Sequence, residues 1–258
     1  MVTTKIPTLD QYWEGLSPHL PLFSPEEQRV AVTLYRELAK GQAVDATQLG
    51  RVLGVSPEEA RAFLTRDSIK SLVYADDRSR VLGFGGLAAA RMHHRFEVDG
   101  RTLSTWCAWD SLFIPEILGK SARVTSPDPE NGEVVRLLVS PDRIESVDPE
   151  GAVVSFLLPD AHDFDISAAN VMAKFCHFVF FFTSRSSGES WMAKHPGTFL
   201  YSLDEAFVLA KLVNAKNFGP ELARRASSAA VIEQSSGCCR TESAEGGVQT
   251  SPMSRRPR

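Results

Sequence analysis

The sequence predicts an α+β fold, with a three-helix, winged-helix-like domain at residues 25–90 and a mostly antiparallel β domain with flanking helices at 91–222. Two patterns predict this class: capped helical segments followed by a strand pair, and then a long run of short strands separated by turn signals. With 258 residues, of which 43% are hydrophobic and 23% charged, the chain is long enough to bury a full core.

The predicted helical domain follows a proline-rich leader, residues 1–24, in which we expect Tyr12 and Trp13 to pack onto the fold. Its three helices each begin at a residue whose side chain can cap free N–H groups, and two of them have proline in the first turn. These starts are Ser24-Pro25, Asp45 and Ser56-Pro57. Strand-like pieces at 71–74 and 81–84 complete the winged-helix pattern.

That pattern allows two interpretations, a DNA-binding module or a structural helical module. The third helix would read the DNA, yet its segment SPEEARAFLTRD carries two arginines against three acids. The chain has a formal net charge of −4 and no Lys/Arg cluster for phosphate contacts. The sequence therefore favours the structural module, and we expect no nucleic-acid partner.

The β domain is predicted from alternating segments and turns, among which Asp99-Gly100 is a strong hairpin signal. We expect a helix that begins after Ser104 or Thr105 and carries Cys107, and a central strand at 175–183. The other expected elements are strands at 91–98, 122–126, 134–139 and 153–158, and helices at 166–173 and 203–211. Residues 223–258 are poor in large apolar side chains, which predicts a disordered tail.

The segment Cys107-Ala108-Trp109-Asp110 places a thiol and a carboxylate three positions apart. On the predicted helix these two side chains share a face, and a carboxyl in an apolar pocket tends to keep its proton. Two interpretations remain open: a reactive soft-metal site, or a buried structural cysteine beside an exposed aspartate. Cys176 lies in the most apolar run of the chain, and this setting by itself favours a core residue.

Common catalytic and metal motifs are missing from the sequence: it contains no HExxH, CxxC, GxGxxG, GxxxxGK[ST] or GxSxG. The leader lacks the apolar segment of a signal peptide, and no apolar run is long enough to span a membrane. We therefore expect a cytoplasmic protein with free thiols and no membrane partner. Two thiols and one acid without a histidine base suit a metal softer than zinc.

Several separate blocks of the sequence resemble the organomercurial lyases (alkylmercury lyases). The resemblance runs from about residue 35 to 218 and preserves the order and spacing of the blocks. These blocks are LYRELAKG at 34–41, WCAWDSLFIPEILGKSARV at 106–124, VSPDRIESVDPEGAVVSFLLP at 139–159, FCHFVFFFTS at 175–184 and W-x-x-KH at 191–195.

The resemblance implies a detoxifying enzyme that cleaves carbon–mercury bonds of alkyl- and arylmercury compounds by protonolysis. It implies that Cys107 is the nucleophile, Cys176 the second thiol ligand and Asp110 the proton donor and a weaker mercury ligand. It also implies no resident cofactor, turnover by cytosolic thiols, and a mercuric reductase as acceptor of Hg(II). The expected pocket side chains are Trp106, Trp109, Phe113 and Phe175.

The sequence departs from the family pattern at His177, where some members have a further cysteine, at the leader, and at the pair Cys238-Cys239. This pair could be a tethered dithiol that collects Hg(II), or an incidental pair in a tail. Two other functions remain as alternatives. One is a non-catalytic thiolate trap for mercury or copper, which would need no Asp110, and the other is a metal-responsive regulator, which would need a basic recognition helix.

Overall fold

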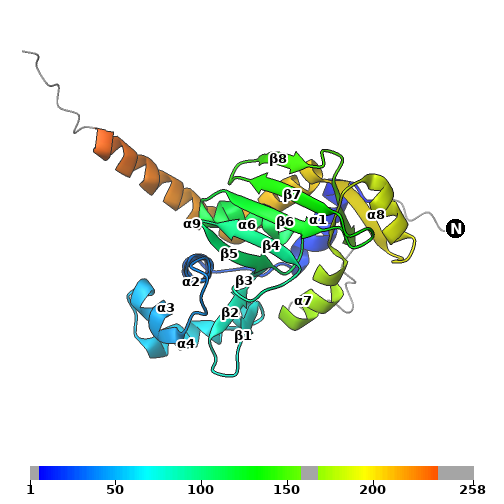
Figure 1. The fold of residues 1–258 in the computed structure, drawn as a ribbon. Coiled ribbons are helices and arrows are strands. Elements are labelled where there is room, and N and C mark those ends of the chain that lie inside the picture. The colour runs from blue at the N-terminus through cyan, green and yellow to red at the C-terminus, as the bar shows by residue number, and fades with distance from the viewer. Residues whose placement is uncertain (1–5, 158–167, 238–258) are drawn as a thin grey trace, which may run out of the picture. The chain divides into compact units, whose positions relative to one another are not determined.

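The computed structural model describes residues 6–157 and 168–237 (Figure 1). Residues 1–222 form one compact unit, and residues 223–258 form a second. The helices are α1 (Leu9–Leu16), η1 (Ser17–His19), α2 (Pro25–Leu38), α3 (Ala46–Leu53), α4 (Pro57–Leu64), α5 (Asp67–Lys70), α6 (Asp110–Leu118), α7 (Ala168–Lys174), η2 (Cys176–Phe178), α8 (Arg185–Met192) and α9 (Leu203–Gly237). Along the described ranges, none is long and apolar enough to cross a membrane.

The strands form two antiparallel sheets, as the α+β prediction requires. They are β1 (Val73–Ala75), β2 (Val81–Phe84), β3 (Leu87–Ala88), β4 (His94–Val98), β5 (Arg101–Thr105), β6 (Ala122–Pro127), β7 (Val134–Val139), β8 (Ile144–Asp148), β9 (Val153–Leu157), β10 (Phe181–Phe182) and β11 (Thr198–Ser202). The larger sheet has the order β1-β2-β3-β5-β4-β6-β7-β8, and the smaller has the order β10-β9-β11.

The predicted β1–β2 hairpin is present, and it belongs to the larger sheet rather than to a separate wing. Strand β2 pairs with β3, and β3 pairs with β5 through Leu87 and Thr105. In Figure 1 this sheet continues from the cyan hairpin to the green strand β8. Strands on both sides of residue 90 therefore lie in one sheet, within the compact unit of residues 1–222.

The predicted helix starts are confirmed. Ser24 caps α2 and Ser56 caps α4, each with a glutamate three residues later that completes a capping box. Asp45 caps α3, which ends at Gly54 in the left-handed conformation. Because these signals are local, they act regardless of what the helices pack against.

The leader also packs onto the fold, as expected. It contains α1, which begins with a capping box at Thr8. Tyr12 is fully buried, its hydroxyl donates to the Leu157 carbonyl at 3.2 Å, and its ring packs edge-on against Phe156 and Phe199. The first helix is thus anchored in the aromatic core on the smaller sheet.

Two predictions around the thiols are wrong. The predicted helix around Cys107 does not form, because Ser104 and Thr105 continue β5 and pair with β4, so that α6 begins only at Asp110. The predicted strand at 175–183 is a 3-10 turn, η2, followed by the two residues of β10. The backbone of that run bonds locally, from the Phe178 N–H to the Phe175 carbonyl at 2.9 Å.

The prediction of disorder from residue 223 is wrong for residues 223–237, which continue α9 as helix. Cys238 and Cys239 lie outside the described residues.

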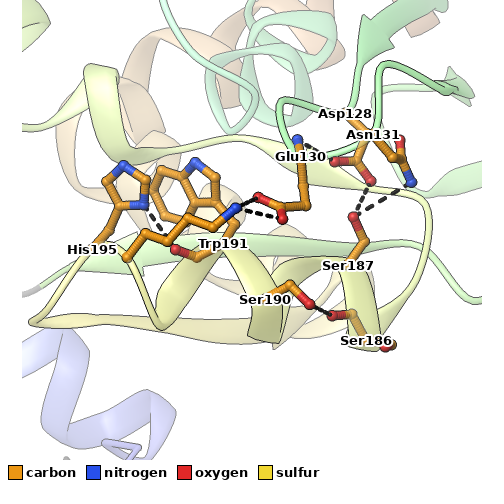
Figure 2. Close-up of polar contacts among 9 residues, drawn as sticks. Asp128, Glu130, Asn131, Ser186, Ser187, Ser190, Trp191 and His195 are labelled. Carbon is orange, nitrogen blue, oxygen red and sulfur yellow. Dashed lines mark hydrogen bonds and ion pairs between the residues drawn. The ribbon is translucent and has the colours of Figure 1, made fainter.

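A buried carboxylate joins the turn after β6 to the start of α8. Asp128 accepts hydrogen bonds from the Thr183 N–H and hydroxyl. It also accepts one from the Ser187 hydroxyl, and Asn131 lies beside that contact (Figure 2). In the same view, His195 Nδ1 donates to the Trp191 carbonyl at 2.8 Å, and the two rings stack with centroids 3.8 Å apart. The bonds between Asp128 and Thr183 tie the end of β6 in the larger sheet to the end of β10 in the smaller one.

Candidate active site

Cys107 and Asp110 lie close together because of the turn between β5 and α6, and not because they share a helix face as predicted. The Cys107 N–H donates to Asp110 Oδ2 at 2.8 Å, and the Thr105 hydroxyl donates to the Cys107 carbonyl at 2.8 Å. The Trp106 N–H donates to the Gly86 carbonyl at 2.8 Å. The turn is therefore held both by its own side chains and by the neighbouring loop.

Cys176 comes from η2, which packs against strand β9. The Ser155 hydroxyl donates to the Phe178 carbonyl at 2.7 Å and accepts from the Phe180 N–H at 3.0 Å. The Ala108 N–H donates to the Val179 carbonyl at 3.1 Å, which links the Cys107 turn directly to the Cys176 segment. Two stretches almost seventy positions apart thus form one site.

The structure brings the three predicted residues together. The sulfur atoms of Cys107 and Cys176 and a carboxylate oxygen of Asp110 all lie within 4.8 Å of one another. All three residues are buried, with exposed fractions of 0%, 4% and 6% in that order. Two soft sulfur ligands and one oxygen at this spacing suit a thiophilic metal.

Burial controls the protonation of this cluster. Desolvation raises the pKa of Asp110 from 3.8 to about 7, although hydrogen bonds from Cys107 oppose the shift. Burial also raises the pKa of the Cys107 thiol well above its ordinary range, with further contributions from Cys176 and Asp110. A hydrogen bond with Cys107 lowers the pKa of Cys176, but burial and the Asp110 charge outweigh it, so this pKa is raised too.

A cavity of about 110 Å³ opens onto Cys176 and Asp110. All four predicted aromatic pocket residues line it: Trp106, Trp109, Phe113 and Phe175. Trp109 is fixed by a hydrogen bond from its Nε1 to the Ala206 carbonyl at 2.9 Å and by an edge contact with Phe113. The wall around the carboxyl is therefore mainly apolar.

Sequence reasoning missed the rest of the cavity wall. Leader residues contribute to it, as do Tyr35 from α2, the glycines at 85 and 86, and Asn217 from α9. The leader side chains are Leu16, His19, Leu20, Pro21 and Phe23. The two adjacent glycines were the available signal, because such pairs often mark a close backbone approach.

Comparisons with known proteins agree with one another. The family model "Alkylmercury lyase" matches residues 87–214. An alkylmercury lyase of Staphylococcus epidermidis is 36% identical over 184 residues, which span 71% of this chain and 80% of that protein. Alkylmercury lyases of Bacillus cereus and Pseudomonas putida are 38% and 37% identical, over 71% and 74% of this chain and 79% and 86% of their own lengths.

A crystal structure of the mercury-bound form of MerB2 has a similar fold, with a TM-score of 0.61 at 20% identity. The likeness covers 80% of this chain and 98% of that one. Together with the sequence identity to the curated relatives over most of their lengths, the family match shows that this chain belongs to the alkylmercury lyase family.

Proposed function

We propose that the protein cleaves the carbon–mercury bond of organomercurials by protonolysis, R–Hg⁺ + H⁺ → R–H + Hg²⁺, and so acts in mercury detoxification. The observation that carries this proposal is the buried cluster of two sulfur atoms and one carboxylate oxygen within 4.8 Å. The curated relatives, which are named alkylmercury lyases, support the same reaction.

In the proposed reaction, the sulfur atoms of Cys107 and Cys176 bind the mercury of the substrate as thiolates. A thiol loses its proton when it coordinates such a metal, which overcomes the raised thiol pKa values of the free site. Two thiolates increase the electron density on mercury and weaken its bond to carbon. After cleavage, Hg²⁺ stays bound to the two sulfur atoms, with Asp110 as a weaker oxygen ligand.

Asp110 supplies the proton that the departing carbon needs. Its pKa of about 7 leaves a large fraction of the carboxyl protonated near neutral pH, as a general acid requires. The same burial that keeps this proton also places the carboxyl beside the metal ligands. A proton released by a coordinating thiol recharges the acid.

The cavity accommodates the organic group. Its volume of about 110 Å³ and its apolar lining suit an alkyl chain or a single aromatic ring. In this proposal the winged-helix-like domain at 25–90 and the leader are structural covers over the substrate, because Tyr35, Leu20 and Phe23 line the cavity.

The proposed enzyme needs no resident cofactor and works in the cytoplasm.

We further propose that cytosolic thiols remove Hg²⁺ from the two sulfur atoms and pass it to a mercuric reductase. Since the product is held by two thiolates, only ligands of similar softness can compete for it. Turnover should therefore depend on added thiol, whereas the first cleavage should not.

The deciding experiment is incubation of the purified protein with phenylmercury and excess thiol, followed by measurement of benzene. The proposal predicts catalytic benzene release, with many product molecules per protein molecule. A protein that binds phenylmercury at the two thiols without releasing benzene is a thiolate trap, and that result would refute the enzymatic function.

A further inference from the structure

The Asp110 carboxyl lies directly against the backbone of a two-glycine turn between β2 and β3. Gly86 has φ +99°, and a Cβ atom at this position would lie 2.6 Å from Asp110 Cγ and 2.7 Å from Oδ1. Any side chain there would push the carboxyl away, so the contact requires glycine. The other carboxyl oxygen, Oδ2, accepts the Cys107 N–H at 2.8 Å. The carboxyl is therefore held from two sides.

Three hydrogen bonds fix the two-glycine turn itself. The Gly85 N–H donates to the Leu72 carbonyl at 3.1 Å, and the Gly86 carbonyl accepts from the Trp106 N–H at 2.8 Å. The third comes from the helical domain: the Tyr35 hydroxyl donates to the Gly85 carbonyl at 2.6 Å. It is the one side-chain bond of the three, so it can be removed without altering the backbone.

Tyr35 is itself held rigidly. It is 2% exposed, and its ring makes edge contacts with Phe84 at 5.3 Å and Phe218 at 6.1 Å between centroids. These ring contacts do not involve the hydroxyl, so a phenylalanine would keep them. Tyr35 also lines the cavity beside Asp110, which places α2 next to the reacting groups.

We infer that Tyr35 is a positioning residue for proton transfer: its hydroxyl fixes the two-glycine turn, and that turn holds the Asp110 carboxyl facing the two thiols. The inference rests on the proposed function, since it assigns Tyr35 a role in placing the proton donor. Proton transfer requires hydrogen-bond distance, and a displacement of about 1 Å can slow such a step by roughly 100-fold. Mercury binding by two thiols is much less sensitive to where the carboxyl lies.

The test is the variant Tyr35→Phe, assayed for benzene release from phenylmercury and for phenylmercury binding at the thiols. We expect kcat to fall by roughly 10- to 100-fold while the binding affinity stays within about twofold. Tyr201→Phe is the matched control, because it removes the hydroxyl of another buried tyrosine, which donates to the Pro7 carbonyl at 2.8 Å. The control should keep the wild-type kcat.

A second pair of variants tests the turn directly. Gly86→Ala places a methyl group against Asp110 and should lower kcat at least as much as Tyr35→Phe. Gly197→Ala carries a similar backbone strain, with φ +89° and no atom within 4 Å of the added Cβ, and should keep kcat. Amide exchange of Cys107, whose N–H bonds Asp110, should speed up in Tyr35→Phe and not in Tyr201→Phe.

The outcomes separate the two claims. If the wild-type protein releases benzene and Tyr35→Phe matches Tyr201→Phe in kcat, the positioning role is wrong. Equal losses of kcat and of binding in Tyr35→Phe also overturn it, because they indicate general structural damage. If the wild-type protein releases no benzene, the proposed function fails, and the proton-transfer role of Tyr35 fails with it.

Discussion

Two buried aspartates lie in very different surroundings. Asp128 is 1% exposed and accepts four hydrogen bonds of 2.8 to 3.0 Å, from the Glu130 and Thr183 N–H groups and from the Thr183 and Ser187 hydroxyls. Asp110 is 6% exposed and accepts the Cys107 N–H, with further hydrogen-bond contributions from the Cys107 side chain and the Trp106 backbone. It also faces the Cys176 thiol, a glycine backbone and an apolar cavity.

The difference shows how burial alone does not decide what a carboxyl does. The N–H and hydroxyl donors around Asp128 satisfy its buried oxygen atoms, so this group joins two parts of the fold. Figure 2 shows its contact with Ser187. Around Asp110, desolvation by the apolar surroundings outweighs the hydrogen bonds from Cys107 and the Trp106 backbone, so its pKa rises to about 7. The two aspartates thus differ in what surrounds them: Asp128 bonds to groups that hold the fold together, and Asp110 faces two thiols and a cavity.

The largest expected effect comes from changing the neighbours of each carboxyl. Cys107→Ser or Cys176→Ser should reduce benzene release from phenylmercury by more than about 1,000-fold, because each removes a metal ligand beside Asp110. Ser187→Ala, which removes a donor 2.8 Å from Asp128, should keep kcat within about twofold and cost about 1 kcal/mol of stability. Benzene assays and chemical denaturation measure both. Strong activity in either serine variant would contradict the assigned thiol roles.

The pH dependence of stability should report the raised pKa of Asp110. The Asp110 carboxyl binds its proton more tightly in the folded protein than in the unfolded chain, since its folded pKa is about 7 and its ordinary value is 3.8. Its contribution to stability is therefore fully present below pH ~4 and is lost as pH rises through ~7, on the order of 4 kcal/mol in total. Wild type should lose stability relative to Asp110→Asn over this window, as measured by denaturation at several pH values.

A pH-independent difference between wild type and Asp110→Asn would mean that Asp110 has the same pKa in the folded protein as in the unfolded chain and is ionised at neutral pH. The proton-donor assignment would then lose its basis.

Removing the Asp128 carboxyl should cost stability without affecting chemistry. Asp128→Ala leaves the Thr183 N–H without its partner in the protein interior, and we expect a loss of about 2–3 kcal/mol in the free energy of unfolding. The folded fraction should keep the wild-type kcat, measured as benzene release per folded molecule. A selective loss of kcat would show that Asp128 takes part in the reaction.

The smallest effect is expected at the surface beside Asp128. Lys194 pairs with Glu130 at 2.6 Å, but the lysine side chain is 62% exposed. Exposed ion pairs contribute about 0.2–1 kcal/mol, so Lys194→Ala should shift the denaturation midpoint only slightly. A loss above about 2 kcal/mol would show that the ion pair supports the Asp128 contacts.

Local signals explain which parts of the fold could be predicted. The caps at Ser24 and Ser56 and the Asp99-Gly100 turn act within a few residues, and the structure confirms all three, with Asp99 and Gly100 both at positive φ. Pairing of the β1–β2 hairpin with β3 depends on longer-range contacts, so its place in the larger sheet could not be read from the pattern.

The site was predicted in composition but not in conformation. The Cys107 turn bonds to the carbonyls of Gly86 and Val179, which are 20 and more than 70 positions away in the sequence, so helical spacing was the wrong guide there. The Cys176 segment is bent by Ser155, a partner from another strand. The contact of Tyr35 with Gly85 spans 50 positions and has no sequence signature of its own.

Whether Asp110 donates the proton can be measured in a single turnover with phenylmercury bound in equal amount to the protein, comparing wild type with Asp110→Asn. The asparagine keeps the shape and the acceptor for the Cys107 N–H but has no acidic proton. We expect Asp110→Asn to bind phenylmercury through both thiols and to release benzene at least ~100-fold more slowly than wild type. Asp128→Asn should release it at the wild-type rate. Benzene release by Asp110→Asn at the wild-type rate would show that Asp110 is not the proton donor.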